Sequence, residues 1–466
     1  MKRVVSTILL VLINFHYGNL SFPKKYGKIS TKAVTGDFGE PLLLTPLIEQ
    51  NRIKEAQAAA RVSLEEFNQV KSYAAFLTVD KIYNSNMFFW FFPAKRNYKS
   101  APVLLWLQGG PGASSLYGLF SENGPFILKG ADKVRHREYT WTHDHSVIYI
   151  DNPVGTGFSF TDGGYAQNET KVGEDLYEAL KQFFILFPEL QKNDFFVTGE
   201  SYAGKYLPAI AYTIIKKNGN DNVKINLQGL AIGNGLSDPE NQLQYGQYLY
   251  EIGLIDTHDR QIFSNLEQQG IKYIQNEQYD KAFNIFDILI NGDLTKQTTA
   301  FKNATGFDNY FNYLQPKGSL NDDIYLGQFL QRGEVRKAIH TGNLTYNNGE
   351  LVEQNLINDV MKPVTPWVSE ILSKYRVLIY NGQLDIIVAY PNTVKYLQKL
   401  KFSGASKYKT AKRTKWYVGD DLAGYAKTAG NLTEVIVRNS GHMVPVDQPK
   451  WALDLITKFT RNISLS

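Results

Sequence analysis

Four short apolar segments, separated by longer helix-like stretches, constrain the fold of this chain most strongly. They read PVLLWLQ (102–108), HSVIYID (145–151), DFFVTG (194–199) and LQGLAIGNG (227–235), and the second and third are separated by the helical pattern VGEDLYEALKQFFILF (172–187). Nearly continuous apolar runs of this length are typical of strands buried on both faces, and their alternation with helices indicates a mostly parallel sheet covered on both sides. We therefore expect an α/β fold.

The strand signals stop after Gly235 and return in YRVLIYNG (375–382) and EVIVRNS (434–440). The sequence between them becomes polar, rich in Tyr and Asn, and helix-like, as in DRQIFSNLEQQGIKYI (259–274). We interpret residues 237–333 as a cap inserted between two parts of the α/β core, 21–236 and 334–466. The first part should open with a helical stretch within 41–72, followed by a strand pair, SYAAFLTVD and NMFFWFFPA.

The first residues predict a signal peptide over 1–20. Lys2 and Arg3 precede an apolar run from Val4 to Phe15, which is too short to span a bilayer. No later stretch has 18 uninterrupted apolar residues, so we expect no membrane anchor and a chain in the secretory pathway, extracellular or in a lysosome or other acidic vesicle. Five sequons indicate a glycosylated surface, and their acceptors are Asn168, Asn303, Asn343, Asn431 and Asn462.

Composition excludes several classes of chemistry. The chain has no cysteine, which removes disulfides, thiolate nucleophiles and thiolate metal ligands. The formal charge is only +5, two of which come from the signal peptide, so we expect no nucleic-acid partner. No His, Asp and Glu set has metal-ligand spacing, and no Gly-x-Gly-x-x-Gly opens a helix. We therefore expect no metal and no cofactor.

Ser201 is the candidate nucleophile. The apolar run DFFVTG leads through Glu200 and Ser201 into the helical pattern AGKYLPAIAYTII, and strand, sharp turn and helix form the context of a nucleophile elbow. The motif reads Gly-x-Ser-x-Ala, which keeps a small residue where the turn and the strand pack closely. Pro208 should bend this helix or delay its start. The alternative is a glycine-rich turn with an ordinary serine.

His442 and Asp385 are the candidate base and acid. Each follows a strand signal, and the hydrolase order of serine, acid and histidine places them there. For Asp385 the alternative is a turn residue. His340 lies on a helical pattern and is expected to be structural, whereas four other histidines in polar stretches are expected at the surface: His136, His143, His145 and His258.

An oxyanion hole requires two backbone N–H groups. WLQGGPGASS follows the strand PVLLW, and its glycines allow a close approach of the backbone, so we assign the two donors to Gly110 and Tyr202. The rival interpretation is a phosphate-binding loop, but the Gly-Lys-Ser/Thr signature is missing.

Several long motifs together resemble the serine carboxypeptidases of the α/β-hydrolase fold, over about Pro41 to the end of the chain. They are LLWLQGGPGASS, FSENGPF, IDNPVGTGFSF, TGESYAGKY, LAIGNG, YNGQLDIIV and NSGHMVPVDQP. Gln108 and the run from Asp151 to Gly157 resemble the vitellogenic-like branch of that family. Ala113 stands where the family usually has Cys, and the family's disulfides are absent, which bears on the rigidity of the cap and not on the catalytic assignment.

The resemblance implies a role for particular residues. The family's triad falls on Ser201, Asp385 and His442, and its oxyanion donors fall on Gly110 and Tyr202. Its binders of the substrate's terminal carboxylate fall on Gln108, Gly109, Glu122 and Glu200. Tyr117 and Met443 match positions that line the pocket for the last side chain, which favours an apolar or aromatic residue.

An acid beside the nucleophile needs an explanation, because an ionised Glu200 would repel a terminal carboxylate. Two acids close together in a closed site cannot both ionise readily, so Glu122 and Glu200 should share a proton, and Glu200 could then donate a hydrogen bond. Such a site prefers acid pH. The alternative is that Glu200 only caps a helix N-terminus.

The predicted function is a serine carboxypeptidase that releases single residues from the C-termini of peptides or proteins through an acyl-enzyme. An acyltransferase on the same triad is a second interpretation. A stabilising or storage protein without activity is a third, and the complete set of triad residues argues against it. A homodimer is possible, although the sequence does not fix the oligomeric state.

Overall fold

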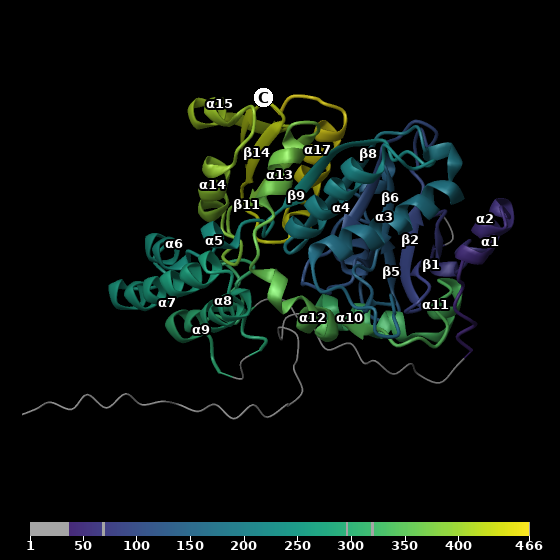
Figure 1. Cartoon of the computed structure of the whole chain (residues 1–466), viewed down its shortest axis with the longest axis horizontal. Helices are drawn as coiled ribbons and strands as arrows, with labels where there is room; N and C mark the ends of the chain where they lie inside the picture. The colour runs from purple at the N-terminus through teal and green to yellow at the C-terminus, as the bar shows by residue number, and fades with distance from the viewer. Residues whose placement is uncertain (1–36, 68–69, 295–296, 318–320, 466) are drawn as a thin grey trace, which may run out of the picture.

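A ten-stranded mixed sheet runs through the molecule (Figure 1) and has the strand order β1-β2-β6-β3-β8-β9-β11-β14-β13-β12. In this computed structural model, residues 37–67, 70–294, 297–317 and 321–465 are described, so the predicted signal peptide over 1–20 lies outside them. The inner strands from β6 to β14 pair in parallel, and both ends of the sheet are antiparallel. The strands are β1 (Tyr73–Asp80), β2 (Ser85–Phe92), β3 (Val103–Leu107), β6 (Ser146–Ile150), β8 (Phe195–Glu200), β9 (Leu227–Gly233), β11 (Arg376–Gly382), β12 (Thr414–Val418), β13 (Asp421–Ala429) and β14 (Leu432–Val437).

Every strand expected from the sequence is present, and the pattern of burial explains why these runs read as apolar. In β3, Leu105 and Leu107 belong to the core on one face of the sheet, whereas Leu104 and Trp106 belong to the core on the other. Both faces exclude water, so both sets of alternating side chains must be apolar. Strands β12 and β13 were not expected. Four smaller strands form two pairs: β4 (Phe126–Leu128) with β5 (Val134–His136), and β7 (Thr156–Gly157) with β10 (Asn347–Asn348).

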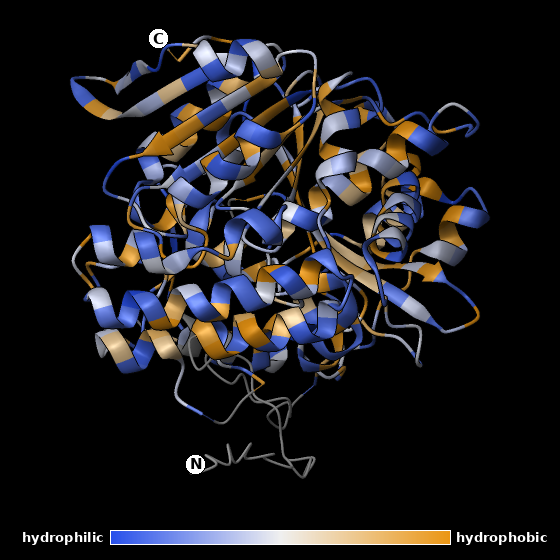
Figure 2. Cartoon of the chain, turned by 60° about the vertical axis from the view of Figure 1, so that its left-hand side comes forward, coloured by the Kyte–Doolittle hydropathy of each residue, from blue (hydrophilic) through white to orange (hydrophobic). Residues whose placement is uncertain are grey.

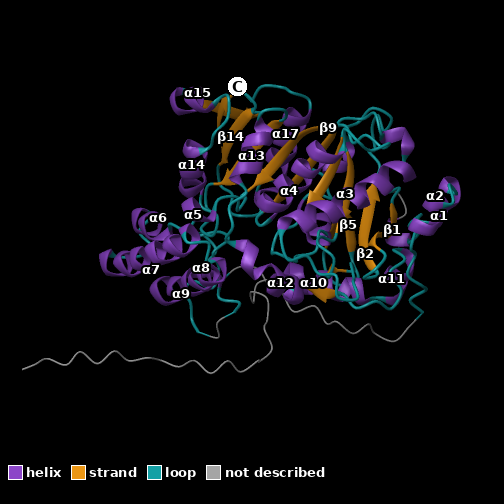
Figure 3. Ribbon diagram, viewed as in Figure 1, coloured by secondary structure: helices purple, strands orange, loops and turns teal. Residues whose placement is uncertain are grey.

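Helices cover both faces of the sheet (Figure 3). On one face lie α3 (Glu169–Leu186), α4 (Ala203–Lys217), α13 (Thr365–Leu372) and α14 (Tyr390–Lys399). On the other lie α17 (Pro449–Thr460), α10 (Asn321–Gln331) and α11 (Gly333–Ala338). Two short helices, α15 (Ala405–Thr410) and α16 (Val444–Asp447), belong to the C-terminal part. None of the described helices is both long and apolar enough to cross a membrane.

The chain between β9 and β11 leaves the sheet and forms a separate group of helices, at the lower left of Figure 1. They are α5 (Pro239–Gln242), α6 (Tyr245–Glu251), α7 (Thr257–Gln275), α8 (Tyr279–Phe286) and α9 (Ala300–Thr305). Figure 2 shows them banded blue and orange, as expected of amphipathic helices that bury one side. Beyond residue 333 the chain is still largely helical, and α12 (Glu350–Val360) packs against α8.

Two local details differ from the sequence-based expectation. The helical stretch near the N-terminus is broken into α1 (Thr45–Glu49) and α2 (Ile53–Ala59), because Asn51 between them has a left-handed backbone with φ +56°. Pro208 does not delay helix α4, which begins at Ala203. The missing N–H of a proline frees the carbonyl four residues earlier, and here Ser237 Oγ donates to the carbonyl of Gly204 at 2.8 Å.

Candidate active site

Ser201 occupies a sharp turn between strand β8 and helix α4. Its φ is +62°, a conformation that strains any residue with a side chain, and it is half-buried. The turn needs small neighbours. A Cβ on Gly199 would lie 2.3 Å from the Leu107 carbonyl oxygen, and one on Gly204 would lie 2.6 Å from the Leu236 nitrogen. The local structure is therefore the elbow that the sequence predicted.

Asp385 and His442 follow the adjacent parallel strands β11 and β14, so both lie at the carboxyl edge of the sheet. His442 Nδ1 is 2.8 Å from Asp385 Oδ2, and both side chains are fully buried. The structure thus brings the predicted acid and base together. His442 Nε2 makes no hydrogen bond within the described residues. The bond that a triad requires between this nitrogen and Ser201 is not formed, which is common in enzymes without substrate.

Asn234 is a site residue that sequence reasoning missed. It follows β9 at the same edge of the sheet, and its Nδ2 donates to Asp385 Oδ2 at 2.7 Å. Asn234 is itself fixed, because its backbone N–H donates to Tyr380 O at 2.8 Å and its Oδ1 accepts from Gly382 N at 3.1 Å. The sequence feature that could have identified Asn234 is the position of an amide residue directly after a buried strand, in LAIGNG.

Residues 310–313, which lie within the predicted cap, hold both catalytic loops. The carbonyl of Phe311 accepts from His442 N at 2.7 Å, and the two rings stack with centroids 4.9 Å apart and an interplanar angle of 22°. The carbonyl of Tyr310 accepts from Ile386 N at 3.1 Å, directly after Asp385. The base and the acid are therefore supported by the insertion as well as by the sheet.

The glycine-rich loop after β3 lies against the elbow. A Cβ on Gly109 would be 2.5 Å from the Tyr202 nitrogen and 2.6 Å from Ser201 Cβ, so only glycine fits there. Gly110 has a φ of +108°, which also favours glycine. The loop thus brings the Gly110 backbone to the same end of the sheet as Tyr202 N.

Gln108, Glu122 and Glu200 form a buried polar group beside the elbow, and all three are at most 1% exposed. Trp106 Nε1 donates to Gln108 Oε1 at 3.1 Å, which fixes the orientation of the amide. Gln108 Nε2 then donates to Glu200 Oε1 at 2.9 Å. Glu122, at the end of a short π-helical turn (Gly118–Glu122), has no hydrogen bond to either carboxyl oxygen within the described residues.

Burial raises the pKa of both acids. The pKa of Glu122 rises to about 7, although Glu200 and Gln108 oppose the shift. The pKa of Glu200 is raised well above its usual range, first by burial and then by the adjacent Glu122 charge. The helix-capping alternative for Glu200 is not supported, because no side chain caps the start of α4.

Tyr117 and Met443 are both half-buried. Of the sequon asparagines, Asn431 is half-buried and its Nδ2 donates to Leu372 O at 2.9 Å, whereas the other four are exposed.

His145 was expected at the surface, and this prediction was wrong. The side chain is fully buried, its Nε2 lies 2.9 Å from Thr460 Oγ1, and burial lowers its pKa to about 4. Within the described residues, no group of three or more His, Cys, Asp or Glu side chains could hold a metal ion.

The sheet, its two helical layers and a serine elbow beside a buried Asp–His pair define an α/β-hydrolase. The chain belongs to the serine carboxypeptidase family, whose model matches residues 63–462. It is 56% identical to a venom serine carboxypeptidase of Apis mellifera, with 99% of each chain covered, and 51% identical to a vitellogenic carboxypeptidase of Aedes aegypti, with 91% of each covered. The protein is therefore a serine-type carboxypeptidase, as the sequence predicted.

A solved structure confirms the fold independently. The yeast prohormone-processing carboxypeptidase Kex1 aligns with a TM-score of 0.74 at 24% identity, covering 87% of this chain and 96% of the Kex1 chain. At that identity the likeness concerns the fold alone.

Proposed function

We propose that this carboxypeptidase removes single residues from peptide C-termini through an acyl-enzyme on Ser201, and that it prefers acid pH. The observation that carries the proposal is the buried group of Gln108, Glu122 and Glu200 beside the elbow. A site that binds a carboxylate with neutral hydrogen-bond donors, rather than with Arg or Lys, selects chain ends only while its acids hold a proton.

In the acylation step, His442 takes the proton of Ser201 as the serine attacks the last peptide bond. Asp385 holds the ring through Nδ1 and stabilises the imidazolium that forms. The N–H groups of Gly110 and Tyr202 bind the negative oxygen of the tetrahedral intermediate. His442 then passes the proton to the leaving amine, and water hydrolyses the acyl-enzyme by the same steps in reverse.

The terminal carboxylate is bound by the Gln108 side chain, the Gly109 backbone and a protonated Glu122–Glu200 pair. Gln108 is fixed by Trp106, so its amide nitrogen points toward Glu200 rather than rotating freely. A protonated glutamic acid can donate a hydrogen bond, whereas an ionised one can only accept. Tyr117 and Met443 line the pocket for the released side chain.

We further propose that residues 237–333 form a cap that restricts the site to chain ends. The stacking of Phe311 on His442 supports this role, because it places part of the insertion directly over the base. A test is to replace residues 257–304 with a short flexible linker, which keeps residues 310–313. The shortened enzyme should cleave internal bonds of larger substrates, whereas unchanged selectivity for chain ends would contradict a capping role.

The acid optimum implies an acidic compartment of the secretory pathway or an acidified secretion. The predicted signal peptide supports this proposal, as do relatives named for venom and for vitellogenesis. We assign glycans to Asn168, Asn303 and Asn343, whose side chains are exposed. We assign none to Asn431 or Asn462, because both line one pocket and are engaged, Asn431 by Leu372 O and Asn462 by Arg376.

A digest of a mixed peptide library at several pH values, read by mass spectrometry, tests the whole proposal. The expected products are peptides shortened stepwise from the C-terminus, most rapidly at acid pH, with peptide amides resistant. Cleavage within the chain, or a rate that rises from acid to neutral pH on free C-termini, would contradict it.

A further inference from the structure

A long stretch of the C-terminal part carries only positive charge. Residues 386–419 contain eight basic residues and no Asp or Glu. The whole chain has a formal charge of +5, so the other residues together carry −3. The positive charge of the protein is therefore concentrated in this segment, which spans helices α14 and α15 and strand β12.

Most of these charges face solvent without an acidic partner. Six of them are exposed, and they lie between α14 and α15, on α15, on the loop that follows it and on β12: Lys401, Lys407, Lys409, Lys412, Arg413 and Lys415. Where salt bridges were found among the described residues, none involves any of these six. We call this surface the basic strip.

Part of the strip is held in place by aromatic rings rather than by acids. The Arg413 guanidinium lies 5.4 Å from the ring centroids of both Tyr390 and Tyr425. Next to the strip, on β13, Lys427 Nζ lies 4.0 Å from the ring centroid of Tyr408. The hydroxyls of Tyr390 and Tyr408 donate in turn to the buried carboxylate of Glu434. Cation–π contacts orient a charge without neutralising it, so these cations stay available to an anion outside.

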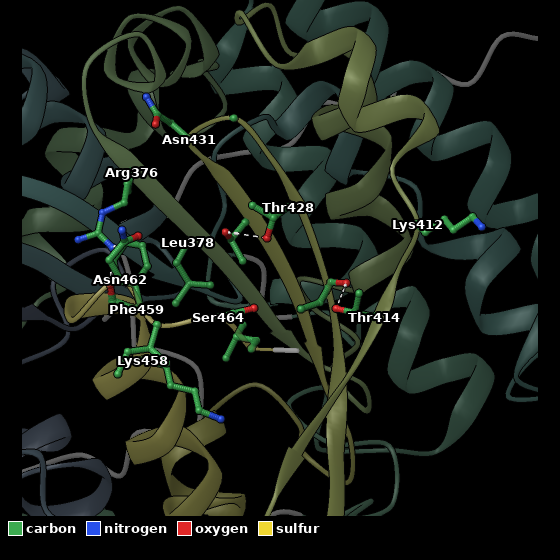
Figure 4. A pocket seen from close by; sticks show the side chains of 15 residues that line it. Arg376, Leu378, Lys412, Thr414, Thr428, Asn431, Lys458, Phe459, Asn462 and Ser464 are labelled. Carbon is green, nitrogen blue, oxygen red and sulfur yellow. Dashed lines mark hydrogen bonds between the residues drawn. The ribbon is translucent and has the colours of Figure 1, made fainter.

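A pocket of about 420 Å³ adjoins the strip (Figure 4). Lys412 and Thr414 belong to both, and Thr428 and Thr433, whose hydroxyl oxygens lie 3.2 Å apart, also line the pocket. No Asp or Glu is among the residues that line it. The pocket therefore extends the strip with hydrogen-bond donors that suit the oxygen atoms of a sugar or of an anionic group.

We propose that the basic strip and this pocket bind a linear sulfated polysaccharide. A run of exposed Lys and Arg suits closely spaced sulfates, and the hydroxyl-lined pocket suits a sugar ring. Single-stranded nucleic acid needs several free aromatic faces for stacking, but Arg413 covers Tyr390 and Tyr408 is buried, so Tyr417 is the one large apolar side chain of residues 386–419 that is exposed. An anionic membrane needs apolar groups that can insert, and the strip itself offers mainly charge.

Binding there would leave catalysis free. Strand β12 is the edge strand of the sheet, and four strands separate it from β8, which carries the nucleophile. Figure 1 places α15 at the top of the molecule, away from the insertion helices. The strip would thus tether a working carboxypeptidase to an anionic matrix.

The test measures binding of a fluorescent heparin octasaccharide to the full chain at about 0.15 M salt, where exposed charges are screened beyond about 8 Å. The patch variant is Lys407→Gln, Lys409→Gln and Lys412→Gln combined. The matched control removes three exposed lysines elsewhere, Lys133→Gln, Lys192→Gln and Lys272→Gln, and so changes the net charge equally. Turnover of a small peptide reports that both variants are folded.

We expect the patch variant to lose at least about tenfold in affinity and the control to lose less than about twofold. A second measurement needs no variant: hydrogen exchange of residues 405–418 should slow when wild type binds the octasaccharide. Equal losses of affinity in both variants would mean that binding depends only on the net charge of the protein, and would overturn the proposal. So would binding to phosphatidylserine vesicles or single-stranded DNA in preference to the octasaccharide, or no binding at all.

Discussion

The active site holds buried carboxyl groups that the fold surrounds in opposite ways. Asp385 receives two hydrogen bonds on one oxygen, from His442 at 2.8 Å and from Asn234 at 2.7 Å. Glu122 is equally buried, but neither of its oxygens has a hydrogen-bond donor within the described residues. Donors stabilise a negative charge, and burial without donors favours the neutral acid.

The difference separates two proposed tasks within one active site. In the mechanism we propose, Asp385 stabilises the imidazolium during acyl transfer, whereas neutral Glu122 and Glu200 accept a substrate that is itself negative. The protein sets each state by what it places around the carboxyl group rather than by the residue type alone.

The largest effect is expected from Ser201→Ala, which removes the proposed nucleophile and leaves the residues proposed to bind the substrate carboxylate intact. Turnover of a peptide should fall by about 10⁴- to 10⁶-fold, while affinity for the peptide should change little. Stopped-flow kinetics and calorimetric binding would measure the two quantities separately. A variant that keeps more than about a tenth of wild-type turnover would exclude Ser201 as the nucleophile.

Asn234→Ala should weaken the hydrogen bonding of Asp385 without changing any of the reacting atoms. It removes one of the two donors to Asp385, and a hydrogen bond to a charged group contributes about 1.5–3 kcal/mol, so kcat should fall by roughly 10- to 100-fold. KM for the peptide should change little. Asn193→Ala is the matched control, because Asn193 is also buried and donates to Ala101 O at 2.9 Å, far from the site. An equal fall in kcat for both variants would mean a general loss of stability.

The elbow and the Asp–His pair could be predicted from the sequence because each follows a strand that is apolar on both faces. Such strands are readable locally, and parallel strands bring their carboxyl ends to one edge of the sheet. The strands DFFVTG, YRVLIYNG and EVIVRNS can be recognised in this way. Ser201, Asp385 and His442 are then expected at the same edge of the sheet.

The contacts of Phe311 with His442 could not be predicted in this way. They join residues 131 positions apart across an insertion whose path depends on tertiary packing, and NYFNYL has no periodicity that marks a catalytic support. Strands β12 and β13 were missed for a related reason. β12 is the edge strand and β13 lies next to it, and both carry exposed polar residues such as Lys415, Asp421 and Thr428, so the apolar alternation that marks a strand is weak.

Glu200→Gln should change the pH dependence rather than abolish activity. In wild type, kcat/KM on a free C-terminus should fall as pH rises through about 7, where the Glu122–Glu200 pair loses its proton and begins to repel the substrate. Glutamine donates a hydrogen bond at every pH, so the variant should lose several-fold less activity between pH 6 and pH 8. The measurement is kcat/KM against pH for both proteins.

A matched ester of the same peptide provides the control for this prediction. It lacks the terminal charge, so its kcat/KM should not fall as pH rises from 6 to 8, for wild type and for Glu200→Gln alike. Superimposable profiles for all four combinations of enzyme and substrate would show that Glu200 does not read the carboxylate.

The last effect concerns stability rather than turnover, and it asks whether a buried acid without donors behaves in the same way outside the active site. Glu169, at the start of α3, is 1% exposed, and neither carboxyl oxygen has a hydrogen-bond partner within the described residues. Burial raises its pKa to about 8, against the opposing charge of Lys205. The folded state therefore holds this proton more tightly than the unfolded state. The proton stabilises the folded state fully below the usual glutamate pKa near 4.5, and this stabilisation is lost as pH rises through about 8. The free energy of unfolding should fall by up to about 1.4 kcal/mol per pH unit between these two pKa values, and Glu169→Gln should remove this pH dependence.

The check is denaturant unfolding at pH 5 and pH 8, with Glu174→Gln as a control on the exposed side of the same helix. If Glu169→Gln and Glu174→Gln both keep the wild-type pH dependence, Glu169 is ionised in the folded protein, and burial without donors is not enough to keep an acid neutral here.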